Sequence, residues 1–283
     1  MRYAADAGCD MAMMVAEVLG VPFDRVRPVV GDTTAIGFSA STGGSRVTFA
    51  GGMAVTQAAQ KVVEELKKRA AVTWDISPEA VEWRDGKAYP AGANAGSFEP
   101  LNLAAIANRA ARTGGPISAE VQINAQGQGP GFTTHICDVE VDKDTGAVKI
   151  LRYTAIQDVG RAIHPSYVEG QMQGGVAQGV GWALNEEYIY DKDGRLENPG
   201  FLDYRVPVAS DMPMIDTVIV EVPNPRHPFG ARGCGEVPIV PPMAAVANAI
   251  AAATGVRLRD LPMSPPRLLA ALDEAQPMRQ AAE

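Results

Sequence analysis

The segment Gly170–Leu184 has the spacing of a helix and contains five glycines. Each glycine inside a helix costs about 1 kcal/mol relative to alanine, so this helix is expected to pack very closely against something. Gln171, Gly174, Gly175 and Gln178 follow an i, i+3, i+4, i+7 pattern and share one face. That face of amides and bare backbone suits a polar, planar or phosphorylated ligand. A tight helix–helix contact explains the same glycines equally well.

A second glycine cluster, Gly230–Glu236, surrounds one carboxylate shortly before a long apolar run. Glycine allows backbone amides to approach a ligand without a Cβ atom in the way. Glu236 is therefore the candidate functional acid of the chain. An acid near a helix start is also favoured by the helix dipole alone, so a purely structural role stays open for this motif.

A third cluster, Gly43–Thr48, precedes an amphipathic helix predicted for Val55–Arg69. Its hydroxyls, amides and single guanidinium suit an anionic group. Serine and threonine are also common helix N-caps, so this signal is weak when taken alone.

The remaining patterns predict an α+β fold with mixed sheets and packed helices in two lobes, residues 1–130 and residues 131–283. The boundary is expected in the glycine-rich stretch Gln126–Gly131. Besides the two helices above, the expected helices are Met11–Leu19, Leu101–Ala111, Ala244–Ala253 and a short one after Ser264. The expected strands are Arg25–Val30, a hairpin within Thr73–Ala93, and a long hairpin formed by Cys137–Val141 and Val148–Ile156.

Composition narrows the classes of partner. The 25 basic and 33 acidic residues give a net charge of −8, without a basic tract or an expected membrane span, so neither nucleic acid nor a membrane is expected as a partner. The three cysteines stand far apart, which argues against a disulfide framework, a zinc site or an iron–sulfur cluster in this chain. The N-terminus lacks the apolar core of a signal peptide, and we expect a cytoplasmic protein.

Several segments of this chain resemble, in sequence and in their order along the chain, the molybdopterin-binding subunit of the xanthine dehydrogenase, aldehyde oxidase and carbon monoxide dehydrogenase family. They are Asp158–Pro165, Glu169–Gln171 with Gly174–Gly175, Phe201–Pro207 and Gly230–Glu236. The resemblance covers essentially the whole chain, from Ala16–Pro22 through Leu261–Pro265.

The resemblance implies roles for individual residues. Glu236 matches the active-site base, and Gln171 matches the glutamine that hydrogen-bonds the pterin. Ser45, Arg46, Val47 and Thr48 match a segment that cradles the cofactor, and Gly233, Cys234 and Gly235 are its expected contacts beside Glu236. No residue of this chain is expected to ligate the metal. Apolar neighbours of Glu236 would raise its pKa by desolvation, and the glycine amides and Arg232 would oppose that shift.

The implied function is a molybdenum-dependent oxidoreductase subunit that hydroxylates an aldehyde or an N-heteroaromatic carbon, with water as the oxygen source. The expected cofactor is molybdopterin with molybdenum, in its cytosine dinucleotide form. Two alternatives are a reductive dehydroxylase of an aromatic thioester and a non-catalytic scaffold subunit of such a complex. Retention of Glu236 and Gln171 argues against the scaffold.

The resemblance also implies partners. Electrons must leave the molybdenum through other chains, so an iron–sulfur subunit and a flavin subunit carrying FAD are expected. Family members have several hundred residues upstream of the matched region, and Gly8–Met11 only loosely matches the family's Gly-Gln-Gly turn. We therefore expect a second molybdopterin-binding chain to supply the upstream half of the site.

Overall fold

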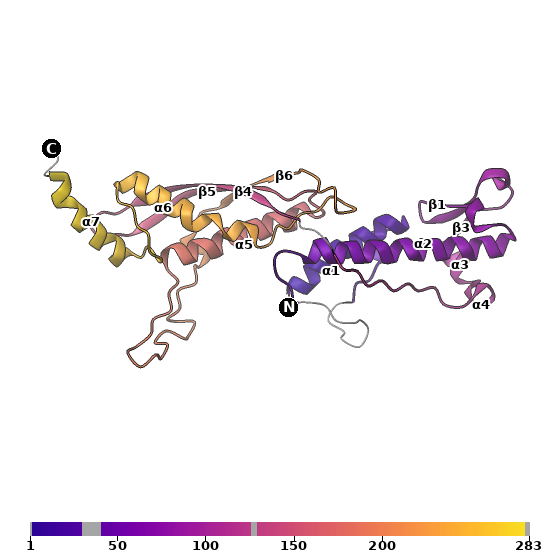
Figure 1. The fold of residues 1–283 in the computed structure, drawn as a ribbon, viewed down its shortest axis with the longest axis horizontal. Coiled ribbons are helices and arrows are strands. Elements are labelled where there is room, and N and C mark those ends of the chain that lie inside the picture. Colours follow the sequence, from indigo (N-terminus) through magenta and orange to yellow (C-terminus); the bar gives the residue numbers. More distant parts are fainter. Residues whose placement is uncertain (1, 30–40, 126–128, 281–283) are drawn as a thin grey trace. The chain divides into compact units, whose positions relative to one another are not determined.

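A computed structural model describes residues 2–29, 41–125 and 129–280, with side chains from residue 9 to residue 275. The chain forms two compact units (Figure 1). The N-terminal unit comprises Met1–Gly129 and Asn224–Ala231, and the C-terminal unit comprises Pro130–Pro223 and Arg232–Glu283. Part of the expected boundary, residues 126–128, lies outside the described residues, and the division into independent lobes at residue 130 stays a prediction.

Two helices, α1 (Arg2–Leu19) and α2 (Gly52–Trp74), pack on each other in the N-terminal unit. The helix predicted for Val55–Arg69 is present and longer at both ends. Its apolar stripe continues from Leu66 through Ala70 to Trp74, all buried, so packing carries the helix to Asp75, whose left-handed backbone ends it. The predicted helix Met11–Leu19 likewise forms the second half of α1.

A small antiparallel sheet packs against α2. It has the order β1 (Val81–Arg84), β2 (Lys87–Pro90) and β3 (Leu101–Asn102), with the predicted turn at Asp85 and Gly86. Both turn residues have positive φ, 49° and 70°, the conformation of a tight hairpin turn.

Two predictions in the N-terminal unit are wrong. Residues 26–29 of the expected strand Arg25–Val30 form no regular structure, and a 3₁₀ turn, Phe23–Arg25, precedes them. Pro28 removes a backbone donor there, and the described part has no strand beside it. The helix expected at Leu101–Ala111 is divided into β3, α3 (Leu103–Ala107) and α4 (Ala110–Thr113), because Asn102 caps α3 by accepting a hydrogen bond from Ala105 N.

The C-terminal unit is built on a three-stranded sheet, in the order β4 (Phe132–Val141), β5 (Val148–Asp158) and β6 (Ile215–Val220). The predicted hairpin of β4 and β5 is present, antiparallel, with a bulge at Asp138 and Val139. Strand β6 runs parallel to β5, with Asp158 paired to Val220 at the end. Mixed helix and strand content in both units confirms the predicted α+β class.

Three helices complete this unit: α5 (Pro165–Leu184), α6 (Pro241–Thr254) and α7 (Pro265–Gln280). Helices α5 and α6 lie along the sheet (Figure 1) and contact its strands and each other. Their interface is the larger core of the chain. Its fully buried side chains include Tyr153 and Ala155 from β5, Met172 and Val176 from α5, and Val246 and Ile250 from α6.

The stretch Val237–Thr254, with a mean hydropathy of 1.5, is long and apolar enough to cross a membrane. That differs from the expectation that no run would approach this composition. Here, however, α6 buries Val246 and Ile250 completely in the core of its unit. Packing therefore accounts for part of the apolar character of the run, of which 28% is buried.

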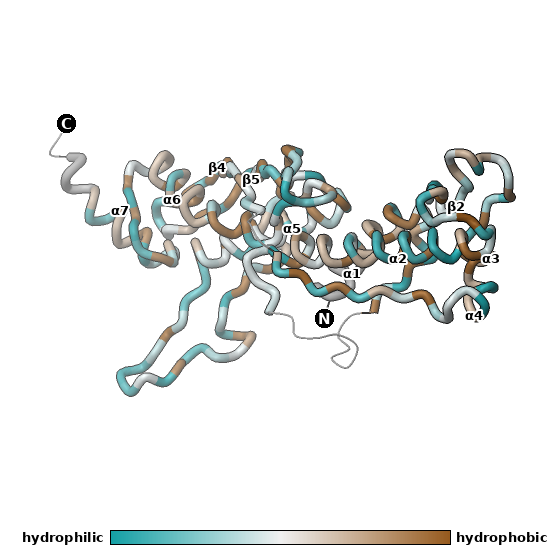
Figure 2. Tube along the Cα trace, turned by 45° about the vertical axis from the view of Figure 1, so that its right-hand side comes forward, coloured by the Kyte–Doolittle hydropathy of each residue, from teal (hydrophilic) through white to brown (hydrophobic). Residues whose placement is uncertain are grey.

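A long loop between α5 and β6 extends away from the sheet and helices of its unit (Figure 1). Hydrophilic residues occupy much of this loop, interrupted by hydrophobic ones (Figure 2). Phe201 and Leu202 of the loop are almost fully exposed.

Neighbouring glycines of α5 are expected to respond in opposite ways to an added methyl group. A Cβ at Gly175 would lie 2.6 Å from Cγ of Pro238, whereas a Cβ at Gly174 would meet nothing within 4 Å. Gly175→Ala should lower the free energy of unfolding by about 1–3 kcal/mol through overpacking. Gly174→Ala should raise it by up to about 1 kcal/mol through helix propensity. Urea denaturation of both variants tests this, and equal effects would contradict the tight contact.

Candidate functional site

Glu236 stands at the N-cap position of a 3₁₀ turn, Val237–Ile239, just before α6. Its side chain is exposed in this chain. Of the apolar neighbours expected to enclose it, only Pro238 is buried, and Pro238 packs against Gly175. The expectation of apolar enclosure by Val237, Pro238 and Ile239 is therefore wrong for this chain by itself, and any desolvation of the acid has to come from another molecule or segment.

Arg232 fixes the entry to the Glu236 loop. Its backbone N donates to Val159 O at 2.9 Å. Its side chain donates from Nε to Val222 O at 2.9 Å and from Nη1 to Pro130 O at 3.1 Å. The same Nε lies 3.2 Å from Oδ2 of Asp158. The ion pair of Arg232 is with Asp158, and its expected influence on Glu236 stays a prediction.

Asp158 is the last residue of β5 and connects the ends of neighbouring strands. Its Oδ1 accepts hydrogen bonds from Gly160 N at 2.9 Å and from Val222 N at 3.1 Å, while Oδ2 faces Arg232. In the sequence, Asp158 stands in a motif that indicates no role for its own side chain. Its main partners lie 64 and 74 positions further along the chain, so no local pattern could have indicated them.

Further contacts hold the middle of the loop. Gln157, fully buried, donates from Nε2 to Cys234 O at 3.4 Å. A Cβ at Gly131 would lie 2.8 Å from both Gly233 O and Val237 Cγ2. Gly131 therefore permits the loop to lie directly on the backbone that enters β4, which explains why a side chain is excluded at that position.

The glycines of α5 have two different surroundings. Gly175 and Gly179 are buried and face Pro238 and Pro242, at distances that leave no room for a Cβ. At Gly170 and Gly174, an added Cβ atom would have nothing within 4 Å. The close helix contact expected from the sequence therefore accounts for one pair of glycines, and the other pair borders open space.

The open side of α5 carries the predicted ligand-facing amides. Gln171 is half-buried, and Gly174 and Gln178 are exposed. Within the described part of the chain, the side-chain amide of Gln171 makes no hydrogen bond. Through the contact of Gly175 with Pro238, the structure brings this helix and the Glu236 loop together in one unit.

The predicted segment Ser45–Thr48 belongs to the N-terminal unit. Ser45 has φ of 53°, a left-handed conformation that few non-glycine residues adopt. Arg46 is exposed, and Val47 begins a π-helical turn, Val47–Gly51. The Thr48 hydroxyl donates to Oδ2 of Asp10 at 3.1 Å, so it already serves the packing of α1 against this turn.

The return segment Asn224–Ala231 is attached to this part of the N-terminal unit by His227. The buried His227 ring lies 5.7 Å from the Phe49 ring, and its Nδ1 accepts from Phe229 N and Ala231 N. Burial lowers the pKa of His227, and a hydrogen bond with the Thr48 backbone opposes that shift. The ring thus supports the turn that contains Thr48.

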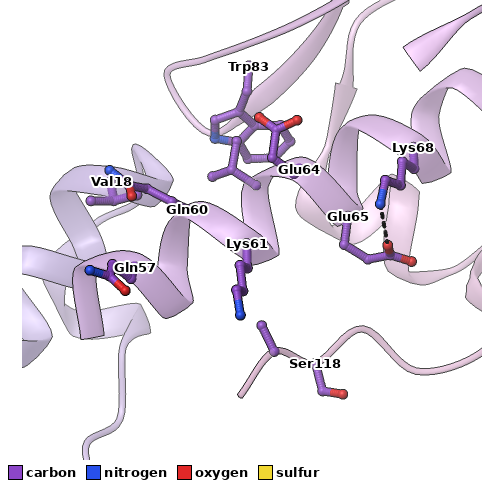
Figure 3. A pocket seen from close by; sticks show the side chains of 11 residues that line it. Val18, Gln57, Gln60, Lys61, Glu64, Glu65, Lys68, Trp83 and Ser118 are labelled. Carbon is purple, nitrogen blue, oxygen red and sulfur yellow. Dashed lines mark ion pairs between the residues drawn. The ribbon is translucent and has the colours of Figure 1, made fainter. Parts of the chain in front are cut away.

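A cavity of about 840 Å³ lies between α2 and residues 118–119 of the N-terminal unit (Figure 3). Charged side chains line it, and Lys68 pairs with Glu65 at 3.9 Å. None of the predicted site residues borders this cavity.

The C-terminal unit has a different buried polar group, in which His135 Nδ1 lies 2.9 Å from the Tyr153 hydroxyl. Burial raises the pKa of Tyr153, as does the nearby Cys137.

The C-terminal unit carries both a helix face of amides and bare backbone, on α5, and a loop in which Glu236 follows several glycines. These features suit a domain that binds a polar cofactor. Residues 8–213 match the family described as the molybdopterin cofactor-binding domain. The chain belongs to this family. The matched residues end before Glu236, whereas the relatives below align over nearly all of the chain.

Relatives and solved structures agree on the family. The chain is 35% identical to a xanthine dehydrogenase molybdenum-binding subunit of Escherichia coli O157:H7, over 91% of this chain and 35% of the relative. It is 31% identical to a carbon monoxide dehydrogenase large chain of Hydrogenophaga pseudoflava, over 93% of this chain and 33% of the relative. Quinoline 2-oxidoreductase from Pseudomonas putida 86 superposes with a TM-score of 0.81 at 29% identity, covering 94% of this chain and 35% of that one. The chain thus spans about a third of the length of the relatives it matches.

Stability should fall in acid because of His135. Burial lowers the pKa of His135 from 6.5 to about 4, so between these values the unfolded chain binds a proton that the folded chain does not. The free energy of unfolding should therefore decline as pH falls from 6.5 towards 4, and His135→Gln should weaken that decline. Urea denaturation from about pH 7.5 to about pH 4.5 measures it. Identical pH dependence in both proteins would contradict the assignment.

Proposed function

We propose that this chain forms part of the catalytic site of a molybdenum hydroxylase, with Glu236 as the active-site base. The proposed substrate is an aldehyde or an N-heteroaromatic carbon, oxidised with water as the oxygen source. The observation that supports it best is an exposed carboxylate, Glu236, in a loop that is held to α5 through Pro238 and Gly175, while Gly170 and Gly174 leave another part of α5 open. Membership of the molybdopterin cofactor-binding family agrees with this reading.

The residues present fit a pterin. Around Gly170 and Gly174, nothing within 4 Å would meet a Cβ, so a flat group has access to bare helix backbone. The half-buried amide of Gln171 offers a donor and an acceptor at the edge of that space. We assign cofactor contacts to Gln171 and to Gly233, Cys234 and Gly235, and further contacts to Ser45, Arg46, Val47 and Thr48. The cytosine dinucleotide form, with its phosphates, suits the exposed guanidinium of Arg46.

The chemistry is divided between the cofactor and this chain. When bound, the molybdenum cofactor supplies the activated oxygen and accepts the two electrons. Glu236 accepts the proton at its carboxylate. A general base is most effective when its pKa lies near the working pH.

Other polypeptide has to complete the site. The chain matches about a third of each relative's length, and we propose that polypeptide equivalent to the unmatched part of those relatives supplies the rest of the site. Electrons then pass to iron–sulfur and FAD subunits, and a cytoplasmic location remains a prediction. The named relatives include subunits of multi-component dehydrogenases, such as a 6-hydroxypseudooxynicotine dehydrogenase complex subunit of Paenarthrobacter nicotinovorans.

Replacing the acid should abolish turnover and leave the cofactor in place. Glu236→Gln in the native assembly should lower kcat by about 10²- to 10⁴-fold, because a general base contributes a factor of that size. The molybdenum content should not change, since the carboxylate is a base and not a ligand. Turnover of aldehydes and azaheterocycles, with molybdenum measured by elemental analysis, tests both statements.

Two results would contradict the proposal. Activity of Glu236→Gln near the wild-type level would remove Glu236 from the reaction. Absence of molybdenum from the wild-type assembly would favour a scaffold role instead. Glu221→Gln is a suitable control, because Glu221 belongs to the same unit and, among the residues that the structure describes, its side chain accepts a single hydrogen bond, from Ala162 N.

A further inference from the structure

We propose that Arg232 and Asp158 are positioning residues that fix the Glu236 loop before any cofactor binds. The inference rests on the proposed role of Glu236 and concerns how the acid is held. Arg232 begins the loop, and Glu236 follows four residues later. The geometry of the Arg232 side chain leaves little freedom at this end of the loop.

Arg232 joins three separate parts of the sheet. It contacts Pro130 before β4, Asp158 at the end of β5 and Val222 after β6. Strands β5 and β6 are parallel, and Asp158 is paired with both Phe132 and Val220. The loop is therefore anchored to the most regular part of the unit, where hydrogen-bonded strands resist displacement.

The surroundings of this ion pair distinguish it from an ordinary surface pair. The Arg232 and Asp158 side chains are each 13% exposed, whereas those of the Arg152–Asp216 pair on the same sheet are 66% and 53% exposed. Exposed ion pairs contribute little to stability. Removing one partner of a buried pair leaves an uncompensated charge and costs much more. The contrast predicts that only the Arg232 pair determines local structure.

The planar guanidinium is required as well as the charge. Nε and Nη1 reach two carbonyl groups and a carboxylate at the same time. A lysine ammonium is a point charge on a flexible stem and lacks this fixed fork. Arg232→Lys should keep the charge near Asp158 and lose at least one carbonyl contact, so the loop should gain freedom while the fold is retained.

The other end of the loop is fixed independently. Gly175 contacts Pro238, and Gln157 donates to Cys234 O within the loop. The segment between Arg232 and Pro238 is short, so a shift at Arg232 is transmitted to Glu236. Displacement of a reacting group by about 1 Å can cost about 10²-fold in rate.

The test compares Arg232→Lys and Asp158→Asn with Arg152→Lys as the matched control, all in the native assembly. Asp158→Asn keeps an oxygen for Gly160 N and Val222 N, and removes the charge and the acceptor oxygen that face Arg232. Hydrogen–deuterium exchange of the peptide covering residues 233–237, measured on cofactor-free protein, should be faster in both variants and unchanged in the control. This readout does not depend on activity.

Kinetics on the loaded assembly give the second readout. Arg232→Lys should lower kcat by about 10²-fold, with KM and molybdenum content unchanged. In a Glu236→Gln background the same substitution should add little further loss, because residues that act as a unit are non-additive.

Three results would overturn the inference: unchanged exchange of the 233–237 peptide in both variants, loss of cofactor from Arg232→Lys, or an equal fold loss with and without Glu236. Loss of cofactor would mean that Arg232 binds it directly. If Glu236→Gln alone left activity intact, the proposed function would fail, and the exchange result would still decide whether Arg232 holds the loop.

Discussion

Close backbone packing between α5 and the segment after Glu236 is the constraint on which the C-terminal unit depends. Gly175 and Gly179 allow Pro238 and Pro242 to lie directly on the helix, at distances a Cβ would not permit. The same contact places α6 on α5 and on the sheet, and the fully buried Val246 and Ile250 complete the core there. A helix that would be poor by propensity is therefore stabilised by tertiary packing, which usually outweighs intrinsic preference.

The Glu236 loop begins at Arg232, beside the ends of the strands, and ends at Pro238, which packs on the core helix α5. Arg232 and Asp158 hold it to the sheet, and Pro238 holds it to α5. A loop supported by rigid elements on both sides can place a charged side chain in a defined position with no contribution from a ligand. Such preorganisation would serve the role proposed for Glu236, because a group that acts in a reaction is most effective when it is already in place.

The sequence indicated the elements of this site better than their roles. Alternating residues predicted the β4–β5 hairpin. The glycine pattern of α5 left a tight contact and a ligand-facing surface as alternatives, and the structure shows a tight contact at Gly175 and Gly179 and open space at Gly170 and Gly174. The strand at Arg25–Val30 and the helix at Leu101–Ala111 failed, because Pro28 and the Asn102 cap act more strongly than local apolar pattern. Assignments of individual cofactor contacts, including Gln171 and Ser45–Thr48, stay predictions.

By itself, the sequence determined the α+β class, the long hairpin, the glycine-rich helix and the family. Those follow from periodicity and from motifs that are local in the chain. Only the tertiary structure decided that Arg232 pairs with Asp158, that Gly175 and Gly174 have opposite surroundings, and that Glu236 is exposed in this chain. Each of these depends on groups brought together from distant positions, and such pairings leave no periodic trace in the sequence.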